Sequence, residues 1–438
     1  MEINWNKVRE DVTDIVRNLI RINTSNPPGN ETEAAVYLQK VLGQAGINST
    51  IYEAAPQRGN LVACLEGNGK NRPLILLAHL DVVDANPTQW TYDPFTGIIA
   101  ENHIWGRGTL DMKGMLAMEV MALLLYKRSG EIPGRDLILV AAADEESGGV
   151  YGMDWLIKQG IPGLEEAEYV INEGGEGKIK DGVPVYACQN GEKGVLWVKI
   201  SVPGIPGHAS IPSKNNAIVK MTKILSRISR YKQPLTLCNT TRGYLAQMAT
   251  QKGAKLPTNH STLDYSLKIF ANRHFSKEKS VQAMLYNTIS PTVLQAGKKT
   301  NVLPDKCELT LDCRLLPGET PENFYERLKD FINDSDVSLE IIQAANPTES
   351  STDTRLYQVI EQAVREENPK AFTVPYLSPG GTDSRFFRIR GITSYGFVPI
   401  LITEAEFQRM HGIDERISLT NLEQGARILY RILREIST

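Results

Sequence analysis

The sequence is poor in cysteine, and the cysteines it has form no recognisable framework. Its 438 residues include five cysteines, which are scattered along the chain and never spaced Cys-x-x-Cys. This distribution favours reduced thiols in a cytoplasmic protein and argues against a disulfide framework or a thiolate zinc site. We therefore expect buried, unreactive thiols and a cytoplasmic location.

Long basic runs and long apolar runs are also missing. The formal net charge is −3, whereas a nucleic acid or an acidic membrane surface would be bound by a basic patch. No window approaches the ~18 uncharged apolar residues of a spanning helix. Residues 1–20 alternate charged and apolar side chains at helical spacing and lack the apolar core of a signal peptide. Neither a nucleic-acid partner nor a membrane partner is expected.

Motifs of two other enzyme classes are absent. The glycine-rich stretch "IWGRGTLDMKG" lacks the Lys-Ser/Thr pair that completes a P-loop. No Gly-x-Ser-x-Gly pattern occurs, so the nucleophile elbow of a serine hydrolase is missing. The chemistry has to be sought in other residue types.

The composition is that of an ordinary globular protein, with 41% hydrophobic and 23% charged residues. Residues 8–20 and 30–45 have helical periodicity. The runs "NLVACL", "PLILLAHLDVV" and "DLILVAAA" are strand-like but do not alternate, and a largely apolar helix, "KGMLAMEVMALLLYKRSG", separates the last two. Strands of this kind are typical of a sheet that helices cover on both faces, which predicts an α/β fold.

The pattern changes near Lys193, and the length of the chain favours two domains. "GVLWVKISVPG" and "KCELTLDCRLLPG" alternate polar and apolar residues, helical stretches lie between them, and helical character resumes after Thr348. We predict that residues 1–193 and 346–438 form one α/β domain. Residues 194–345 would form a smaller α+β domain inserted into it.

One buried strand ends in three adjacent acids. In "DLILVAAADEESGG" the apolar run is followed by Asp144, Glu145 and Glu146. Carboxylates crowded at the end of a core element repel one another and are costly to desolvate unless a positive charge lies among them.

Other candidate ligands also follow strand-like runs or glycine turns. His79 ends an apolar run, with Asp81 two residues later on the same face, although His79 alone could be a satisfied core histidine. Asp111 follows a glycine turn and could equally be a helix N-cap. Glu173 ends the run "YVIN", and His411 lies in the polar turn "RMHGIDERISL". Two imidazoles and three carboxylates at strand ends suit two divalent zinc-like ions sharing one carboxylate, with one glutamate left for proton transfer.

With these residues in place, the sequence resembles the M20 metallopeptidases. This family of cocatalytic zinc amidases and exopeptidases includes acetylornithine deacetylase, succinyl-diaminopimelate desuccinylase, aminoacylase, glutamate carboxypeptidase and yeast carboxypeptidase S. The resemblance covers nearly the whole chain. The motifs that carry it occur in the family's order: "HLDVV", "GRGTLDMKG", "DEESGG", "NEGG", "GHAS", "NVLPDKCELTLDCRLLPG", "GGTDSRFF" and "HGIDERI".

The resemblance implies a zinc-exopeptidase-like catalytic domain with a mixed central sheet and a pair of divalent ions. Zinc is the expected metal, with cobalt or manganese as alternatives. Glu145 would be the general base, and Asp81 would orient a ligand. The implied ligands are His79, Asp111 and Glu173 for one ion and Asp111, Glu146 and His411 for the other.

The resemblance also implies roles for the inserted domain, which would serve as a lid and as a homodimer interface. His208 of "GHAS" would stabilise the tetrahedral oxyanion in the site of the neighbouring subunit. Asn301 and Arg314 would receive the oxyanion side and the carboxylate of the substrate, although Arg314 could instead form an ion pair with Asp312 in its strand. The implied pocket lining is Gly380, Gly381 and Thr382.

Two features depart from the shorter deacetylases. The insert has extra length between residues 231 and 297, which favours the aminoacylase and carboxypeptidase S branch. His103 stands where relatives usually show a turn. We predict a solvated turn residue there, with an additional metal ligand as the alternative.

The expected reaction is hydrolysis of the amide bond of an N-acyl amino acid or a small peptide with a free carboxylate. Dipeptidase, carboxypeptidase and aminopeptidase activities of the same family are the alternatives. A non-catalytic binding protein on the same fold would have lost His79, Asp111 or Glu145, and all three are present.

Overall fold

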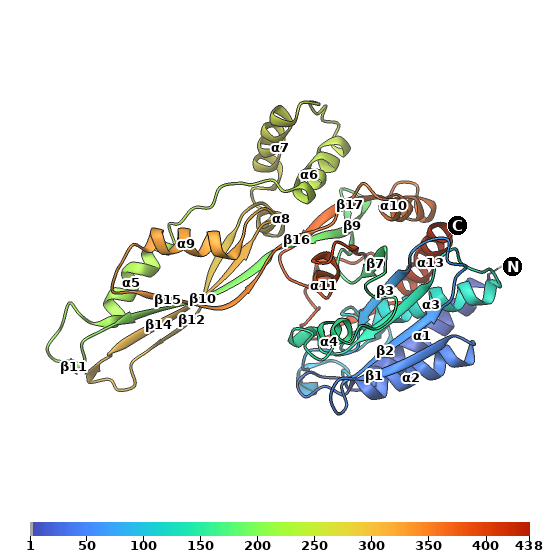
Figure 1. Cartoon of the computed structure of the whole chain (residues 1–438), viewed down its shortest axis with the longest axis horizontal. Helices are drawn as coiled ribbons and strands as arrows, with labels where there is room; N and C mark the ends of the chain where they lie inside the picture. The colour runs from blue at the N-terminus through green and yellow to red at the C-terminus, as the bar shows by residue number, and fades with distance from the viewer. Residues whose placement is uncertain (1–2) are drawn as a thin grey trace. The chain divides into compact units, whose positions relative to one another are not determined.

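The structure, a computed structural model, describes residues 3–438, and its chain divides into two compact units (Figure 1). Unit 1 runs to Asn190 and includes Ser350–Tyr376 and Thr382–Thr438, and unit 2 comprises Gly191–Glu349 and Leu377–Gly381. Within the described range, no helix is both long and apolar enough to cross a membrane.

A mixed sheet forms the centre of unit 1, in the order β1-β2-β6-β3-β7-β18-β9. β6, β3, β7 and β18 are mutually parallel neighbours, whereas β1, β2 and β9 join in antiparallel fashion, and β8 and β17 pair with β9. The predicted α/β fold with a mixed sheet is confirmed. The strands are β1 (Asn48–Glu53), β2 (Gly59–Leu65), β3 (Leu74–His79), β6 (Leu137–Ala142), β7 (Tyr169–Asn172), β8 (Gly177–Lys180), β9 (Val183–Glu192), β17 (Phe372–Ser378) and β18 (Thr393–Gly396).

Both faces of this sheet are buried, because alternate residues of the central strands enter different cores. Leu74 and Leu76 of β3 lie in one core and Ile75 and Leu77 in the other. This explains why the strands read as continuous apolar runs rather than alternating ones. The helices of the first core are α1 (Trp5–Arg21), α2 (Glu31–Gln44), α3 (Lys113–Ser129), α10 (Arg355–Glu367) and α13 (Leu419–Ile436), and those of the second are α4 (Met153–Lys158) and α11 (Ser384–Arg388).

A small second sheet of unit 1 brings distant segments of the chain together. Its order is β19-β5-β4, from Arg416–Ser418, His103–Trp105 and Ile98–Ala100. β19 pairs antiparallel with β5, so the chain after β5 and the chain before β19 leave the sheet side by side. The short helix α12 (Glu404–Phe407) precedes β19 in the sequence.

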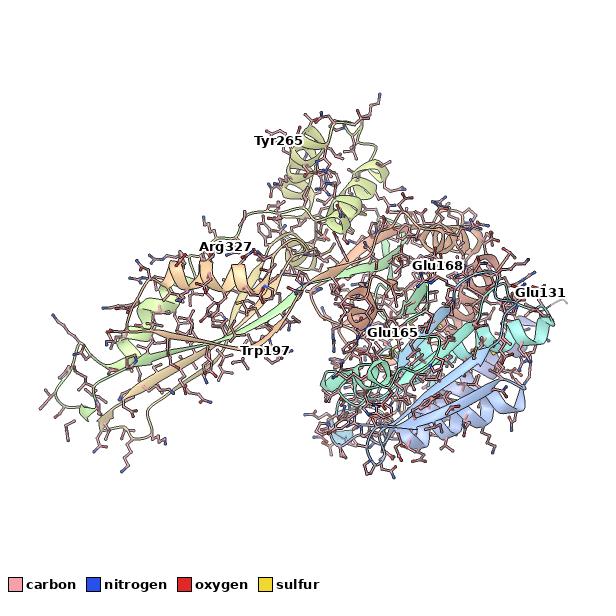
Figure 2. All side chains as sticks on the ribbon, viewed as in Figure 1. Glu131, Glu165, Glu168, Trp197, Tyr265 and Arg327 are labelled. Atoms are coloured by element: carbon pink, nitrogen blue, oxygen red, sulfur yellow. The ribbon has the colours of Figure 1, made fainter. Side chains whose placement is uncertain are left out.

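Unit 2 is built on a four-stranded antiparallel sheet, ordered β12 (Thr288–Ala296), β14 (Lys306–Leu315), β10 (Gly194–Pro203) and β15 (Ser338–Ala345). Residues of β10 alternate: Leu196 and Val198 are buried against α5 (Ala217–Ile228) and α9 (Pro321–Ile332), whereas Trp197 is only partly buried (Figure 2). The alternation predicted for this sheet is confirmed.

The additional length of unit 2 forms helices. α6 (Asn239–Gln251), α7 (His260–Phe275) and α8 (Lys279–Leu285) follow one another, and α6 contacts α7. Tyr265 projects from α7 and is 69% exposed (Figure 2). The remaining strands are β11 (Gly207–His208), which pairs with β13 (Val302–Leu303), and β16 (Thr348–Glu349), which pairs with β9.

Candidate metal centre

The candidate ligands meet at one edge of the unit 1 sheet. His79 is the last residue of β3, and Glu173 directly follows β7, which is parallel to it. Glu145 and Glu146 lie in a 3-10 turn, η2 (Glu145–Ser147), after β6, the other parallel neighbour of β3. Because parallel strands end at the same edge, their carboxyl ends bring these side chains together.

Asp111 connects the two histidines. Its Oδ1 lies 3.0 Å from Nε2 of His79, and its Oδ2 lies 3.0 Å from Nε2 of His411. Glu173 Oε2 lies 3.5 Å from the same His79 nitrogen, and Glu146 Oε1 lies 3.2 Å from that of His411. The contacts thus form two groups of three that share Asp111.

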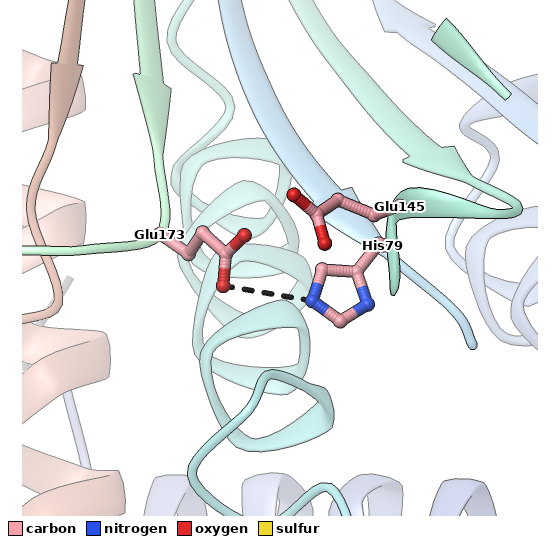
Figure 3. Close-up of side chains that lie close together, drawn as sticks. All are labelled: His79, Glu145 and Glu173. Atoms are coloured by element: carbon pink, nitrogen blue, oxygen red, sulfur yellow. Dashed lines mark ion pairs between the residues drawn. The ribbon is translucent and has the colours of Figure 1, made fainter. Parts of the chain in front are cut away.

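Glu145 lies beside this cluster. Ligand-type atoms of His79, Glu145 and Glu173 lie within 4.8 Å of one another, as do those of His79, Asp111 and Glu146. Figure 3 shows the Glu145 carboxylate above the His79 ring, with an ion pair drawn only between His79 and Glu173. Nitrogen and oxygen donors gathered in this way suit a divalent cation.

Crowding and burial shift the protonation of the cluster. Burial raises the pKa of Glu173 to about 8 against the opposing effect of His79. Burial, reinforced by Glu173, raises the pKa of Glu145 well above its ordinary value. The carboxylates of Asp111 and Glu146 raise the pKa of His411 to about 10. Divalent ions held among these groups would supply the positive charge that balances the crowded carboxylates.

Asp81 ties the turn that carries Glu145 and Glu146 to the strand that carries His79. Its Oδ1 accepts a hydrogen bond from the backbone N–H of Glu145 at 3.1 Å, and its Oδ2 accepts from that of Glu146 at 3.2 Å and from Asn26 Nδ2 at 2.9 Å. The main-chain oxygen of Asp81 lies 3.0 Å from His79 Nδ1, closer than its carboxylate at 3.5 Å. Hydrogen bonds to a charged group contribute roughly 1.5–3 kcal/mol each, so this turn is firmly placed.

Asp144, the first acid of the run, belongs to neither group of candidate ligands and has its own cation. Its carboxylate accepts hydrogen bonds from Arg58 Nη2 at 2.8 Å, Asn26 Nδ2 at 3.0 Å and the N–H of Tyr151 at 3.0 Å. Arg58 also pairs with the fully buried Glu31. Sequence reasoning assigned no role to Asn26 or Arg58, because neither lies in a motif that specifies chemistry.

The structure bears on two interpretations that the sequence left open, an N-cap role for Asp111 and a solvated turn at His103. Met112, not Asp111, is the N-cap residue of α3, so the capping interpretation of Asp111 does not hold. The prediction that His103 is a solvated turn residue is wrong. It is the first residue of β5, which pairs with β19, only 19% of its side chain is exposed, and its Nε2 lies 3.5 Å from Glu406 Oε1.

The three residues expected to act from the insert, His208, Asn301 and Arg314, lie in unit 2. Arg314 donates to Asp312 from Nε at 2.7 Å and from Nη2 at 3.0 Å, so the strand ion pair left open by the sequence is formed. His208 is exposed, and its Nδ1 lies 2.7 Å from Ser210 Oγ. Asn301 accepts the N–H of Ala209 through its main-chain oxygen.

Gly380 and Gly381 belong to unit 2, where the chain returns to unit 1 after β17. Thr382, the first residue back in unit 1, is buried, and its Oγ1 accepts hydrogen bonds from Asn172 Nδ2 at 3.3 Å and from the N–H of Ser384 at 3.2 Å. These contacts fix the start of α11.

The chain is similar to known proteins along most of its length. The profile of peptidase family M20/M25/M40 matches residues 75–435. The human N-fatty-acyl-amino acid synthase/hydrolase PM20D1 is 28% identical over 420 residues, covering 93% of this chain and 82% of that protein. Human aminoacylase-1 is 24% identical, covering 97% and 95%. The M20 family metallo-carboxypeptidase Sso-CP2 of Sulfolobus solfataricus superposes with a TM-score of 0.71 at 19% identity, covering 97% and 98%.

Proposed function

We propose a reaction from the premise that the chain belongs to peptidase family M20/M25/M40 and is a metal-dependent hydrolase of amide or peptide bonds. It deacylates N-acyl amino acids at a dinuclear centre in unit 1. One observation carries the proposal. The two oxygens of Asp111 contact two different histidines, which is the arrangement of a carboxylate that bridges two ions.

The ligands would divide as the contacts do. His79, Asp111 and Glu173 would hold one ion, and Asp111, Glu146 and His411 would hold the other. Bound divalent ions, zinc in the first instance, would polarise the substrate carbonyl and lower the pKa of water.

Glu145 would handle the proton of the attacking water. It stands beside His79 and Glu173, and Asp81 fixes its backbone. As the water oxygen bonds to the carbonyl carbon, Glu145 would take its proton and then deliver it to the amine nitrogen as the C–N bond breaks. Because Asp81 holds the backbone of Glu145 and not its carboxylate, the carboxylate can move from the water to the amine nitrogen.

The free carboxylate of the substrate would bind in unit 2. Arg314 presents a planar cation suited to a bidentate contact, although Asp312 competes for it. Asn301 would receive the oxyanion side of the substrate, and Gly380, Gly381 and Thr382 would line the pocket. The name of the human relative supports an N-acyl amino acid. The similarity to an archaeal metallo-carboxypeptidase keeps carboxypeptidase action as the second candidate.

A substrate panel tests the proposal. The zinc- or cobalt-loaded protein should release amine from N-acyl amino acids, with dipeptides and C-terminal peptides included for the second candidate. The matched control is the methyl ester of the preferred substrate, which lacks the carboxylate and should be cleaved far more slowly. Equal cleavage of ester and acid would refute carboxylate recognition, and no release from any compound would refute the proposed reaction.

His208 would serve the site of a second chain in a homodimer formed through unit 2. Because Ser210 engages Nδ1 of the exposed ring, Nε2 is the atom that would donate to the tetrahedral oxygen. Such a donor contributes on the order of a few kcal/mol to the transition state.

Subunit mixing tests this role. His208→Ala and Glu145→Gln should each be nearly inactive alone. A mixed dimer would contain one site with an intact Glu145 and an intact His208 from the other chain, so activity should partly return. If subunit exchange is demonstrated and activity stays absent, His208 does not act across the interface.

A further inference from the structure

A buried ion pair joins the segment that carries Asp111 to the segment that carries His411. Arg107 Nη1 lies 2.6 Å from Glu415 Oε2, and the two residues are 2% and 0% exposed. Arg107 precedes Asp111 by four positions, and Glu415 follows His411 by four. Neither residue is itself among the candidate ligands.

The Glu415 carboxylate accepts hydrogen bonds from the backbone of residues 108–111, called here the Asp111 turn. Oε1 accepts from the N–H of Leu110 at 2.6 Å and from the N–H of Asp111 at 3.1 Å, and Oε2 accepts from the N–H of Gly108 at 3.0 Å. Together with Arg107, four donors converge on one buried carboxylate. One of them is the backbone of the bridging residue itself.

Arg107, in the segment that carries Asp111, in turn donates to the segment that carries His411. Its Nη2 donates to the main-chain oxygen of Gly412, next to His411, at 2.7 Å, and the N–H of Gly106 donates to the main-chain oxygen of Glu415 at 2.9 Å. Desolvating a charged pair is costly unless its hydrogen-bonding capacity is used. Here the bonds run between the two ligand segments, so the pair fixes the position of one segment relative to the other.

The neighbouring acid, Asp414, gives a natural contrast. Its carboxylate accepts hydrogen bonds from the N–H of Thr91 at 2.8 Å and from Thr91 Oγ1 at 2.9 Å. It thus anchors the His411 segment to another part of unit 1 and has no hydrogen bond to the Asp111 turn in the structure described.

We propose that Glu415 and Arg107 are positioning residues that hold the bridging carboxylate of Asp111 at its distance from His411, and thereby set the affinity of the centre for both ions. The inference rests on the proposed dinuclear centre. If the ion pair served only the fold, its loss would destabilise the protein without changing the metal affinity of the folded state.

Glu415→Gln is the direct test. The amide keeps the size of the side chain but replaces one acceptor oxygen with a donor, which would face N–H groups. Because Asp111 serves both ions, both should bind more weakly, by about 10–100-fold, the usual cost of losing a partner of a metal ligand. The readouts are chelator-competition titration with zinc and the absorption spectrum of the cobalt-loaded protein, each interpreted beside the thermal unfolding of the metal-free form.

Asp414→Asn is the matched control, since it alters an acid of the same segment that does not touch the Asp111 turn. Because the amide oxygen of asparagine can still accept the N–H of Thr91, the segment should stay anchored and both ions should bind with wild-type affinity. Should Glu415→Gln not fold, two other variants are expected to show the same double loss. Glu415→Asp keeps the charge but shortens the side chain, and Arg107→Lys loses the guanidinium that contacts Glu415 through Nη1 and Gly412 through Nη2.

The outcomes separate the two proposals. Wild-type affinity for both ions in folded Glu415 or Arg107 variants overturns the positioning role, as does an equal loss in Asp414→Asn. A wild-type protein that binds fewer than two ions would instead refute the dinuclear centre, whatever the variants do.

Discussion

Replacing Glu145 with glutamine is expected to lower turnover on the order of 10²-fold or more while both metal ions remain bound. The amide has the shape of the carboxylate but cannot accept the proton of the attacking water. Asp81 would still hold the turn, because it accepts the backbone N–H of residue 145 and not its side chain. Steady-state kinetics and elemental analysis of the same preparation measure the two effects.

Glu146→Gln is the matched control for Glu145→Gln, since the two residues are adjacent in the same turn. Glu146 Oε1 lies 3.2 Å from His411 Nε2, so its loss should weaken one ion and lower activity by that route. Added metal should partly restore Glu146→Gln and should have no effect on Glu145→Gln. Equal metal loss in the two variants would mean that Glu145 is a ligand.

Two of the candidate ligands could be placed near each other from the sequence, because each lies at the end of a run that predicts a strand. His79 and Glu173 follow apolar runs that become the parallel strands β3 and β7. Non-alternating strands also predicted the two covered faces of the sheet correctly. Periodicity is a local signal, and these features depend on local order along the chain.

The residues that support the ligands could not be found in the same way. Arg58 reaches Asp144 across 86 positions, and Glu415 reaches Leu110 across 305. No periodic pattern records such pairings, which only the folded chain creates. His103 shows the same limit, because its partner Glu406 and the strand that pairs with β5 both come from the far end of the sequence.

The sequence also left open whether the guanidinium of Arg314 binds a neighbouring side chain or the substrate. Arg314 and Asp312 lie on the same side of β14, and their bidentate contact is the alternative that was weighed against substrate binding. A carboxylate substrate would have to compete with Asp312 for the guanidinium. The predicted role of Arg314 therefore stays a prediction.

Removing the metal is expected to abolish activity altogether. Without cations the cluster holds protons instead, as the raised pKa values of Glu173 and His411 indicate, and the polarisation of the substrate carbonyl is lost. Zinc, cobalt or manganese should restore turnover, because nitrogen and oxygen donors accept all three. Magnesium and calcium, which prefer oxygen ligands, serve as the control ions and should restore much less.

The most direct test of the proposed dinuclear centre is a titration of the chelated protein with zinc or cobalt. Bound metal and amine release from an N-acyl amino acid are measured at each point. We expect no turnover in the metal-free protein and a plateau at about two equivalents per chain. Full turnover by protein that elemental analysis shows to be metal-free would contradict the central claim.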